Sequence, residues 1–363
     1  MAKAKAASPD ATTLHVDKAD IVRALTAVGR VIENRNTYPI LANVHLSTKD
    51  GQLTVRGTDL DIEITTSIPC DGDAEPFTAP AKTLLDIVRK FADGQVALER
   101  EGETLHVKSG RSRFKLPTLQ VDSFPTLKGG KLSEPFAINL AALFKDTSFA
   151  TNQSDNRTFM HGVQLESFQG KARATASDGH RLARITGEAV PDFEAVNFPL
   201  KTIGVIPDGD VTLAVSRDKV QIEFGSTTIL SKLIDTPYPE LERLIPKNNE
   251  RAVQFDRPSM SAAVDRVSTI ASERGGKSVK FTAGGGRVEL AVTNPDHGEA
   301  TDEVVTTYEG GDVSIGFNCS YVSDILRAAG GAGVTFHLAD GLSPALVTCD
   351  DPNKTFVLMP QRI

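Results

Sequence analysis

The stretch "ATASDGHRLARIT", residues 174–186, decides how the chain is divided, because its pattern occurs three times. The same order of strand-forming residues, an acidic turn and further strand-forming residues is found in "VRGTDLDIEI", residues 55–64, and in "AVTNPDHGEATDE", residues 291–303. Asp-Gly and similar pairs favour tight turns between strands. The three stretches therefore predict one strand–turn–strand unit in three copies.

An amphipathic helix opens each copy. Asp17, Asn139 and Asp256 precede these helices and lie roughly 120 positions apart, a spacing typical of whole domains and not of solenoid units. The first two helices of the chain and the opening helix of the third copy show the apolar spacing of a helix packed on one face. The predicted buried positions are Ile21, Ala24, Leu25, Val28, Leu84, Ile87, Val88, Phe91, Met260, Ala263, Val264 and Val267.

Strands with period-2 alternation follow each helix, so the sequence predicts an α+β fold of three similar domains. The expected boundaries are 1–133, 134–252 and 253–363, with a disordered leader at about residues 1–12. The six expected helical segments are 18–35, 79–91, 138–147, 198–206, 256–274 and 317–328.

The composition excludes several classes of protein. With 40% hydrophobic and 24% charged residues, the chain of 363 residues has the balance of a soluble globular protein. No apolar run approaches the roughly 20 residues that a membrane-spanning helix needs. Cys70, Cys319 and Cys349 are odd in number and lack the spacing of a metal site, which favours the cytoplasm.

No catalytic pattern withstands inspection. Ser177, Asp178 and His180 include the residue types of a hydrolytic triad, but neighbours along an extended strand point to opposite faces. The segment "SERGGKSVKF", residues 272–281, lacks the first glycine of a phosphate-binding loop. The histidines and carboxylates form no metal-ligand pattern. We expect neither an enzyme nor a cofactor or metal site.

Charge separates the helices from the rest of the chain. The six helical segments hold 13 Lys/Arg against 8 Asp/Glu, a net of +5, whereas the whole chain carries −7. Arg23 and Arg30 lie opposite the apolar stripe of the first helix, and Lys82 and Arg89 do so on the second. A solvated helix face would explain any one of these helices. Their repetition indicates a basic helical surface suited to a phosphate backbone without base readout.

Eight stretches in order resemble the bacterial sliding clamps, the beta subunits of DNA polymerase III. They are "NRNTYPILANVHL", "GTDLDIE", "RSRFKLPTLQVDSFP", "SDGHRLA", "LIDTPYPELERLIPKN", "YEGGDVSIGFNCSYVSDIL", "LSPALV" and the terminal "FVLMPQRI". The resemblance covers nearly the whole chain. It implies three domains that form half of a ring, with helices lining the pore and sheets outside, and a head-to-tail homodimer around double-stranded DNA bound without sequence preference.

The resemblance also implies partners and sites. DNA polymerase III alpha, clamp-loader subunits, other polymerases and repair proteins would bind through short peptide motifs. The implied DNA-binding residues are Arg35, Thr158, Phe159 and Lys201. The implied peptide pocket between the middle and last domains contains Met160, Ser177, Gly179, His180, Arg181, Leu182, Pro239, Arg243, Leu244, Tyr321, Pro344, Val357, Met359, Pro360 and Gln361.

The chemistry of these residue types fits such a pocket. Leu182, Leu244, Val357 and Met359 would offer an apolar cleft, and Arg181 and Arg243 would hydrogen-bond a peptide at its rim. Two alternatives stay open at this point. The pocket residues could serve only to pack two domains together, or the protein could be a peptide-binding scaffold that does not encircle DNA.

Overall fold

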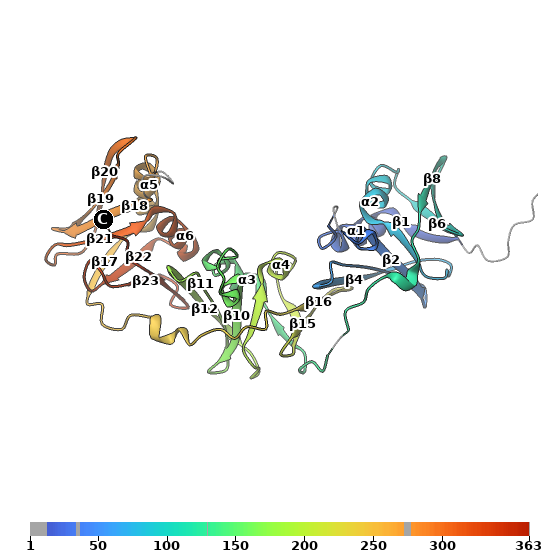
Figure 1. The fold of residues 1–363 in the computed structure, drawn as a ribbon, viewed down its shortest axis with the longest axis horizontal. Helices are drawn as coiled ribbons and strands as arrows, with labels where there is room; N and C mark the ends of the chain where they lie inside the picture. The colour runs from blue at the N-terminus through green and yellow to red at the C-terminus, as the bar shows by residue number, and fades with distance from the viewer. Residues whose placement is uncertain (1–12, 34–36, 129, 272–276, 363) are drawn as a thin grey trace, which may run out of the picture. The chain divides into compact units, whose positions relative to one another are not determined.

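The structure is a computed structural model that describes residues 13–33, 37–128, 130–271 and 277–362. The expected leader lies outside these residues. The chain forms two compact units, Met1–Ala137 with Asp210–Lys232 and Ile138–Gly209 with Leu233–Ile363. Figure 1 shows the ribbon with its helices and strands labelled.

One supersecondary pattern, a strand, a helix and three strands, occurs six times along the described residues. The first two copies contain β1 (Leu14–Asp17), α1 (Lys18–Val28), β2 (Asn43–Lys49), β3 (Gln52–Thr58), β4 (Ile62–Pro69), β5 (Phe77–Pro80), α2 (Ala81–Arg89), β6 (Gln95–Glu101), β7 (Thr104–Ser109) and β8 (Ser112–Pro117). Short 3-10 turns η1 (Pro39–Ala42) and η2 (Val121–Ser123) flank them.

The remaining copies follow the same order. The middle pair contains β9 (Phe136–Ile138), α3 (Leu140–Lys145), η3 (Ser148–Ala150), η4 (Thr158–His161), β10 (Gly162–Phe168), β11 (Lys171–Ser177), β12 (Arg181–Ala189), β13 (Val196–Pro199), α4 (Leu200–Ile203), β14 (Val211–Val215), β15 (Lys219–Phe224) and β16 (Thr227–Lys232). The last pair contains η5 (Leu241–Leu244), β17 (Arg251–Asp256), α5 (Arg257–Ser268), β18 (Ser278–Gly284), β19 (Arg287–Asn294), β20 (Gly298–Val305), β21 (Val313–Asn318), α6 (Cys319–Ala329), β22 (Gly333–Leu338), β23 (Ala345–Cys349) and β24 (Lys354–Leu358).

Within the described residues, the strands form four sheets that follow from this repetition. Two four-stranded sheets have the orders β1-β6-β7-β8 and β20-β19-β18-β21. Two eight-stranded sheets have the orders β5-β2-β3-β4-β16-β15-β14-β9 and β13-β10-β11-β12-β24-β23-β22-β17. The eight-stranded sheets arise where two fourth strands pair antiparallel, β4 with β16 and β12 with β24. Sheets of adjacent repeats are therefore continuous through backbone hydrogen bonds.

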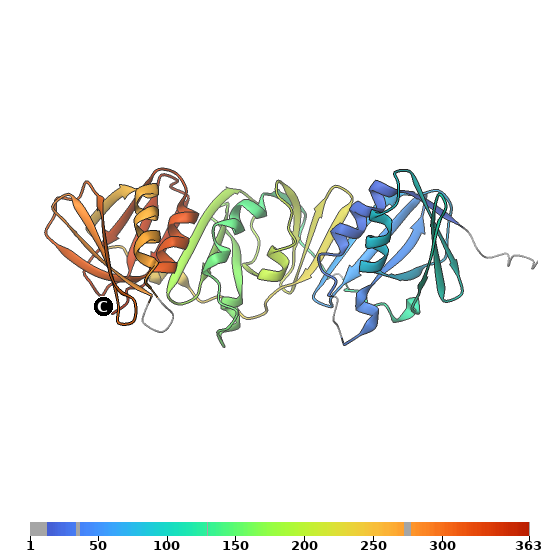
Figure 2. The same ribbon diagram turned by 90° about the horizontal axis from the view of Figure 1, so that it is seen from above.

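The helix predictions hold in position, although the helices are shorter than the expected segments. Asp17, Asn139 and Asp256 each accept a hydrogen bond from a backbone N–H of the first turn, as N-caps do. Every predicted position of the apolar stripes is buried. In Figure 2, α1 and α2 lie side by side, as do α5 and α6. The antiparallel strand pairs and their packed helices confirm the α+β fold class.

The three turn stretches occupy equivalent positions between the third and fourth strands, as expected. In the first repeat the Asp59 carboxylate accepts from the N–H groups of Asp61 and Ile62, at 2.9 and 2.7 Å. In the third repeat, Asp178 accepts in the same way from the N–H groups of His180 and Arg181, at 2.9 Å each. The residue between has a positive φ in both, 80° at Leu60 and 84° at Gly179. Glycine takes this conformation without the steric cost that a leucine bears.

Candidate functional site

The turn of residues 177–181 is a closed hydrogen-bonded structure. The Ser177 hydroxyl donates to the Arg181 carbonyl at 2.9 Å, and the Gly179 N–H donates to the same hydroxyl at 3.2 Å. The Ser177 N–H donates to the Tyr238 hydroxyl at 3.0 Å. Neither Ser177 nor Asp178 hydrogen-bonds the His180 ring in these contacts, and the imidazole stacks on Tyr321 with ring centroids 6.1 Å apart. The Ser177 hydroxyl thus donates to a backbone carbonyl and not to a general base.

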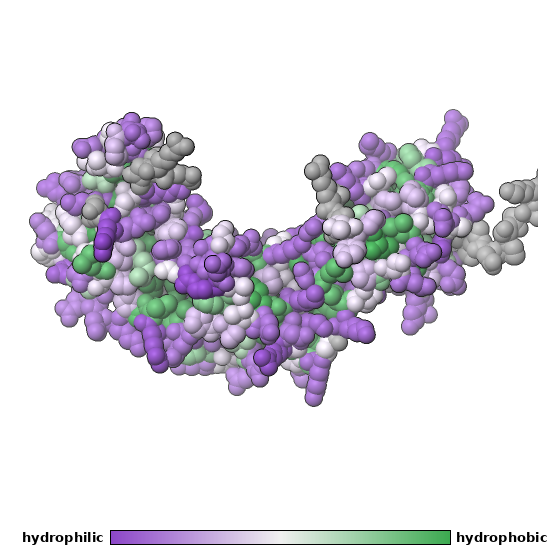
Figure 3. All heavy atoms as spheres, viewed as in Figure 1, coloured by the Kyte–Doolittle hydropathy of each residue, from purple (hydrophilic) through white to green (hydrophobic). Residues whose placement is uncertain are grey.

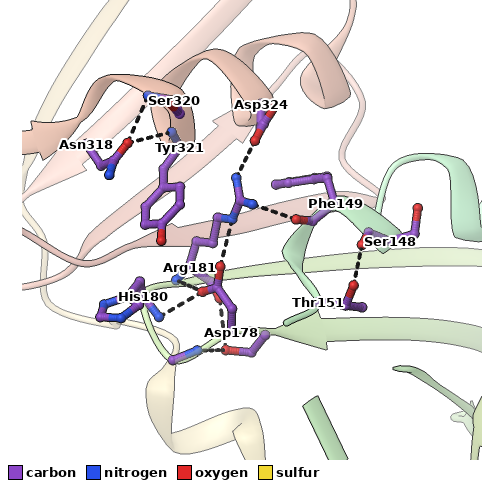
Figure 4. Close-up of polar contacts among 12 residues, drawn as sticks. Ser148, Phe149, Thr151, Asp178, His180, Arg181, Asn318, Ser320, Tyr321 and Asp324 are labelled. Atoms are coloured by element: carbon purple, nitrogen blue, oxygen red, sulfur yellow. Dashed lines mark hydrogen bonds and ion pairs between the residues drawn. The ribbon is translucent and has the colours of Figure 1, made fainter. Parts of the chain in front are cut away.

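Arg181 begins β12 with a side chain that is only 9% exposed, so the expectation that it lies at a rim is wrong. Its guanidinium donates to Asp178 at 3.0 Å, to Asp324 of α6 at 2.6 Å and to the Phe149 carbonyl at 2.6 Å. Its Cζ also lies 4.3 Å from the ring centroid of Tyr321. Figure 4 shows these partners around the guanidinium. Because the N–H donors of its guanidinium bind protein groups, Arg181 joins the 177–181 turn to α6.

Leu182 points to the opposite face of β12, because successive side chains of a strand alternate. It is 2% exposed and forms an apolar cluster with Val357 of β24 and Leu241 of η5. Leu182 and Val357 are directly opposed in the β12–β24 pairing. Tyr238 and Ile245 pack against this cluster. The expected neighbourhood of Leu182 and Val357 is thus present, on the sheet face that residues 238–245 cross.

Two apolar side chains on the segments that supply this cluster, η5 and the end of β24, reach solvent. Leu244 is 51% exposed and Met359 is 40% exposed. The Met359 N–H donates to the His180 carbonyl at 2.8 Å, which fixes the chain end next to the turn. Pro239 and Arg243 are also exposed, and Arg243 pairs with Glu240 at 3.2 Å. Figure 3 shows hydrophobic atoms, in green, reaching the surface of the chain among hydrophilic ones. Exposed apolar atoms over a buried apolar floor suit the docking of a peptide side chain.

The other expected pocket residues lie at different depths. Met160 is buried, and a Cβ on Gly179 would lie 3.5 Å from its terminal methyl group. Tyr321 is half-buried between His180 and Arg181, and burial raises its pKa. Pro344 is half-buried and accepts a hydrogen bond from Asn249 at 2.9 Å. Half-buried Pro360 precedes Gln361, whose N–H donates to the Gly316 carbonyl at 2.8 Å.

The sequence analysis did not identify the residues that hold the site residues in place. Tyr238 has its hydroxyl on the Ser177 N–H, and burial raises its pKa to about 12. Leu241 completes the apolar cluster. Asp324 and Phe149 hold Arg181. Tyr238 and Leu241 stand in the stretch "DTPYPELERL", where their spacing on either side of proline could have marked them, whereas nothing in the sequence links Phe149 to Arg181.

The expected DNA-binding residues that the structure describes lie on η4 and α4. Arg35 lies outside the described residues. Thr158 and Phe159 belong to η4, where the Thr158 hydroxyl hydrogen-bonds Thr236 and the Phe159 ring meets Tyr238 edge-on at 5.3 Å. These two residues therefore contact the segment next to the apolar cluster. Lys201 lies exposed on α4.

Neither a metal site nor a membrane-spanning helix is found among the described residues. Among the described residues, no three His, Cys, Asp or Glu side chains are grouped closely enough to hold a metal ion. No helix within the described part of the chain is long and apolar enough to cross a membrane.

Comparison with protein families assigns each third of the chain. Residues 12–128 match the N-terminal domain, residues 137–240 the central domain and residues 242–362 the C-terminal domain of the DNA polymerase III beta subunit. Together with the threefold α+β repeat, these matches define the fold as that of a DNA clamp.

Proteins that match over nearly the whole chain support the same family assignment. The chain is 38% identical to the beta sliding clamp of Caulobacter vibrioides, covering 96% of this chain and 100% of that protein. It is 35% identical to the beta sliding clamp of Pseudomonas aeruginosa, covering 96% and 99%. A crystal structure of the C. crescentus beta sliding clamp superposes with a TM-score of 0.92 at 37% identity, over 97% of this chain and 100% of that one. The protein belongs to the DNA polymerase III beta subunit family, the bacterial sliding clamps.

Proposed function

We propose that this protein is the sliding clamp of a DNA polymerase III, a homodimer that encircles duplex DNA and tethers the polymerase and other partners for processive synthesis. The observation that carries the proposal is the match of the whole chain to beta sliding clamps, at 38% identity and 96% coverage. The domain limits 1–133, 134–252 and 253–363 are part of it, as is a location in the cytoplasm, where the chromosome is replicated. The chain acts by binding and carries out no catalytic step.

The strand pattern supports the homodimer. Where repeats join, the fourth strand of one copy pairs with the fourth strand of another, β4 with β16 and β12 with β24. In the described sheets, the fourth strands β8 and β20 each have a neighbour on one side only. Unpaired edges are ready to add a strand. Antiparallel pairing of β8 with β20 of a second copy would repeat the junction and close the assembly.

The two edges are complementary in charge. β8 carries Arg113 and Lys115, whereas β20 carries Glu299 and Glu303, all of them exposed. Each edge also exposes an apolar residue, Phe114 at 41% and Val305 at 78%, which an interface would cover. Light scattering should give twice the chain mass of 38.9 kDa at micromolar concentration. A strict monomer would argue against a ring.

The apolar cluster at Leu182 supports peptide binding by DNA polymerase III alpha, clamp-loader subunits, other polymerases and repair proteins. A peptide ending in leucine or phenylalanine would bury one or two apolar side chains, each contributing roughly 1.5–3 kcal/mol. Association entropy offsets much of this gain, so a single peptide should bind at about micromolar affinity.

DNA binding should be weak and independent of sequence, because the helical segments carry a net of only +5 on an acidic chain. Retention on DNA would then be topological. After loading by an ATP-driven loader, the protein should stay on closed circular DNA in high salt and leave when the circle is cut. Loss from closed circles in salt alone would mean that binding is electrostatic, and would favour a peptide-binding scaffold that does not encircle DNA.

A further inference from the structure

One face of the sheet beneath the proposed peptide site carries a cluster of charged side chains. Glu166 of β10 opposes Arg173 of β11, and Thr175 of β11 opposes Arg184 of β12. Arg184 and Leu182 are two positions apart on β12, so their side chains share a face. The charged cluster therefore lies on the same face as the apolar cluster, one residue pair further along the sheet.

The two arginines of this cluster are almost removed from solvent, with side chains 9% exposed for Arg184 and 12% for Arg173. Glu166 binds Arg173 at 2.9 Å. Glu242 accepts from Arg184 at 2.7 Å and lies 3.8 Å from Arg173. The hydrogen bond from Arg184 lowers the pKa of Glu242, which keeps the carboxylate charged at neutral pH. The two buried guanidinium groups are thus balanced by two carboxylates, of which Glu242 is itself 48% exposed.

Glu242 differs from the other three charges because it comes from the connector, defined here as residues 233–250 between β16 and β17. In the connector, η5 (Leu241–Leu244) is a single 3-10 turn without a side-chain cap. Leu241 packs into the apolar cluster and Glu242 binds the arginines, while the next residues, Arg243 and Leu244, remain exposed. Two adjacent anchors of different chemistry fix the rotation of this turn about its axis.

We propose that Glu242 is a positioning residue for the peptide site: its ion pairs with Arg184 and Arg173 hold η5 so that Leu244 forms a wall beside Leu182 and Met359. This inference rests on the proposed peptide binding. Without the carboxylate, Arg184 and Arg173 are left with Glu166 alone, and the excess positive charge no longer attracts the connector. Leu241 remains as a non-directional apolar anchor, which does not specify where Leu244 points.

The connector supplies a matched control. Glu240 lies two residues before Glu242 and pairs with Arg243 at 3.2 Å, but both side chains are largely exposed, at 68% and 84%. An exposed pair of this kind is screened by water and salt, so its loss should change little. Glu240→Gln and Glu242→Gln each remove one negative charge at or next to η5. They differ most in the exposure of the arginine partner, 84% for Arg243 against 9% for Arg184.

The test uses the full-length wild type, Glu242→Gln and Glu240→Gln. Fluorescence anisotropy measures binding of a labelled polymerase tail peptide ending in leucine or phenylalanine, and hydrogen exchange with mass spectrometry measures opening of each segment. We expect Glu242→Gln to weaken peptide binding by about threefold to tenfold, as loss of a charge-assisted contact would. Exchange should become faster in residues 238–246 and stay unchanged in β10–β12. Glu240→Gln should match the wild type in both measurements.

Each outcome bears on one of the two proposals. Peptide affinity and connector exchange that stay at wild-type levels in Glu242→Gln would overturn the role of Glu242. Faster exchange throughout β10–β12 would also overturn it, since the carboxylate would then support the sheet and not the connector. A wild type that binds no peptide would refute the proposed peptide binding, while the exchange measurement would still decide whether Glu242 holds the connector.

Discussion

Replacing Arg181 by alanine should destabilise the second unit more than it affects peptide binding. The substitution removes three hydrogen bonds, to Asp178, Asp324 and the Phe149 carbonyl, and the packing of the guanidinium on Tyr321. Asp178 is 5% exposed and would lose the partner of one carboxylate oxygen. Arg181→Ala therefore leaves a buried charge without its counter-ion.

The size of the effect follows from what remains bonded. Removing one member of a buried ion pair costs about 3–5 kcal/mol. Asp178 keeps two backbone N–H donors, and Asp324 is 25% exposed and keeps Arg327 at 2.8 Å. We therefore expect the free energy of unfolding to fall by about 3 kcal/mol, the lower end of this range. In a unit of about 200 residues this corresponds to a fall in Tm of about 6–12 °C.

Scanning calorimetry on the full-length protein measures this change. Arg327→Ala is the matched control, because Arg327 binds the same Asp324 carboxylate but is 74% exposed. Its loss should cost less than about 1 kcal/mol. Arg181→Lys keeps the charge but not the planar fork, and should fall between the two. If Arg181→Ala melts like the wild type yet binds peptide much more weakly, Arg181 contacts the peptide and its assignment as a link to α6 is wrong.

Three further predictions concern the interface, the chain end and the partly buried Tyr238. Phe114→Glu should place a charge on the β8 edge and shift the dimer towards monomer in light scattering, whereas an unchanged mass would exclude β8 from the interface. Deletion of residues 359–363 should weaken binding of the polymerase peptide, measured by anisotropy, at least about tenfold and leave the dimer mass and the Tm nearly unchanged. Unchanged peptide binding would show that residues 177–182 serve only to pack the domains together. The pKa of Tyr238 is raised to about 12, whereas a tyrosine in the unfolded chain ionises near 10, so its contribution to stability should fall as pH rises from about 10 to 12. Denaturation of Tyr238→Phe should lack this part of the pH dependence, and an equal slope in both proteins would contradict the assignment.

Much of the fold follows from short-range patterns in the sequence. The N-caps Asp17, Asn139 and Asp256 and the buried stripe of α5 are found where periodicity placed them, because capping and amphipathic packing act within a few residues. The equivalence of the turns at Asp59 and Asp178 extends to individual hydrogen bonds. Repetition strengthened these predictions, since each copy tested the others.

The depth of the site residues could not be predicted in the same way. Arg181 and Leu182 are neighbours in a single motif, but strand alternation sends one towards α6 and the other into the apolar cluster. Which side of β12 faces which partner depends on its pairing with β24, more than 160 positions away in the chain. Pairings of that separation leave no local pattern in the sequence, and the same is true of the contact between Glu242 and Arg184.

Among the described sheets, β8 and β20 are the two fourth strands of a repeat that have a neighbour on one side only. They differ in sequence and can be disabled independently. A mixture of chains altered only at β8 with chains altered only at β20 would then associate through a single junction, formed by the two unaltered edges. In the proposed ring, such a two-chain molecule would have a permanent gap, through which duplex DNA could enter without a loader and escape without a nick. The residence time of such an assembly on circular DNA would then report how many of its two subunit interfaces are closed.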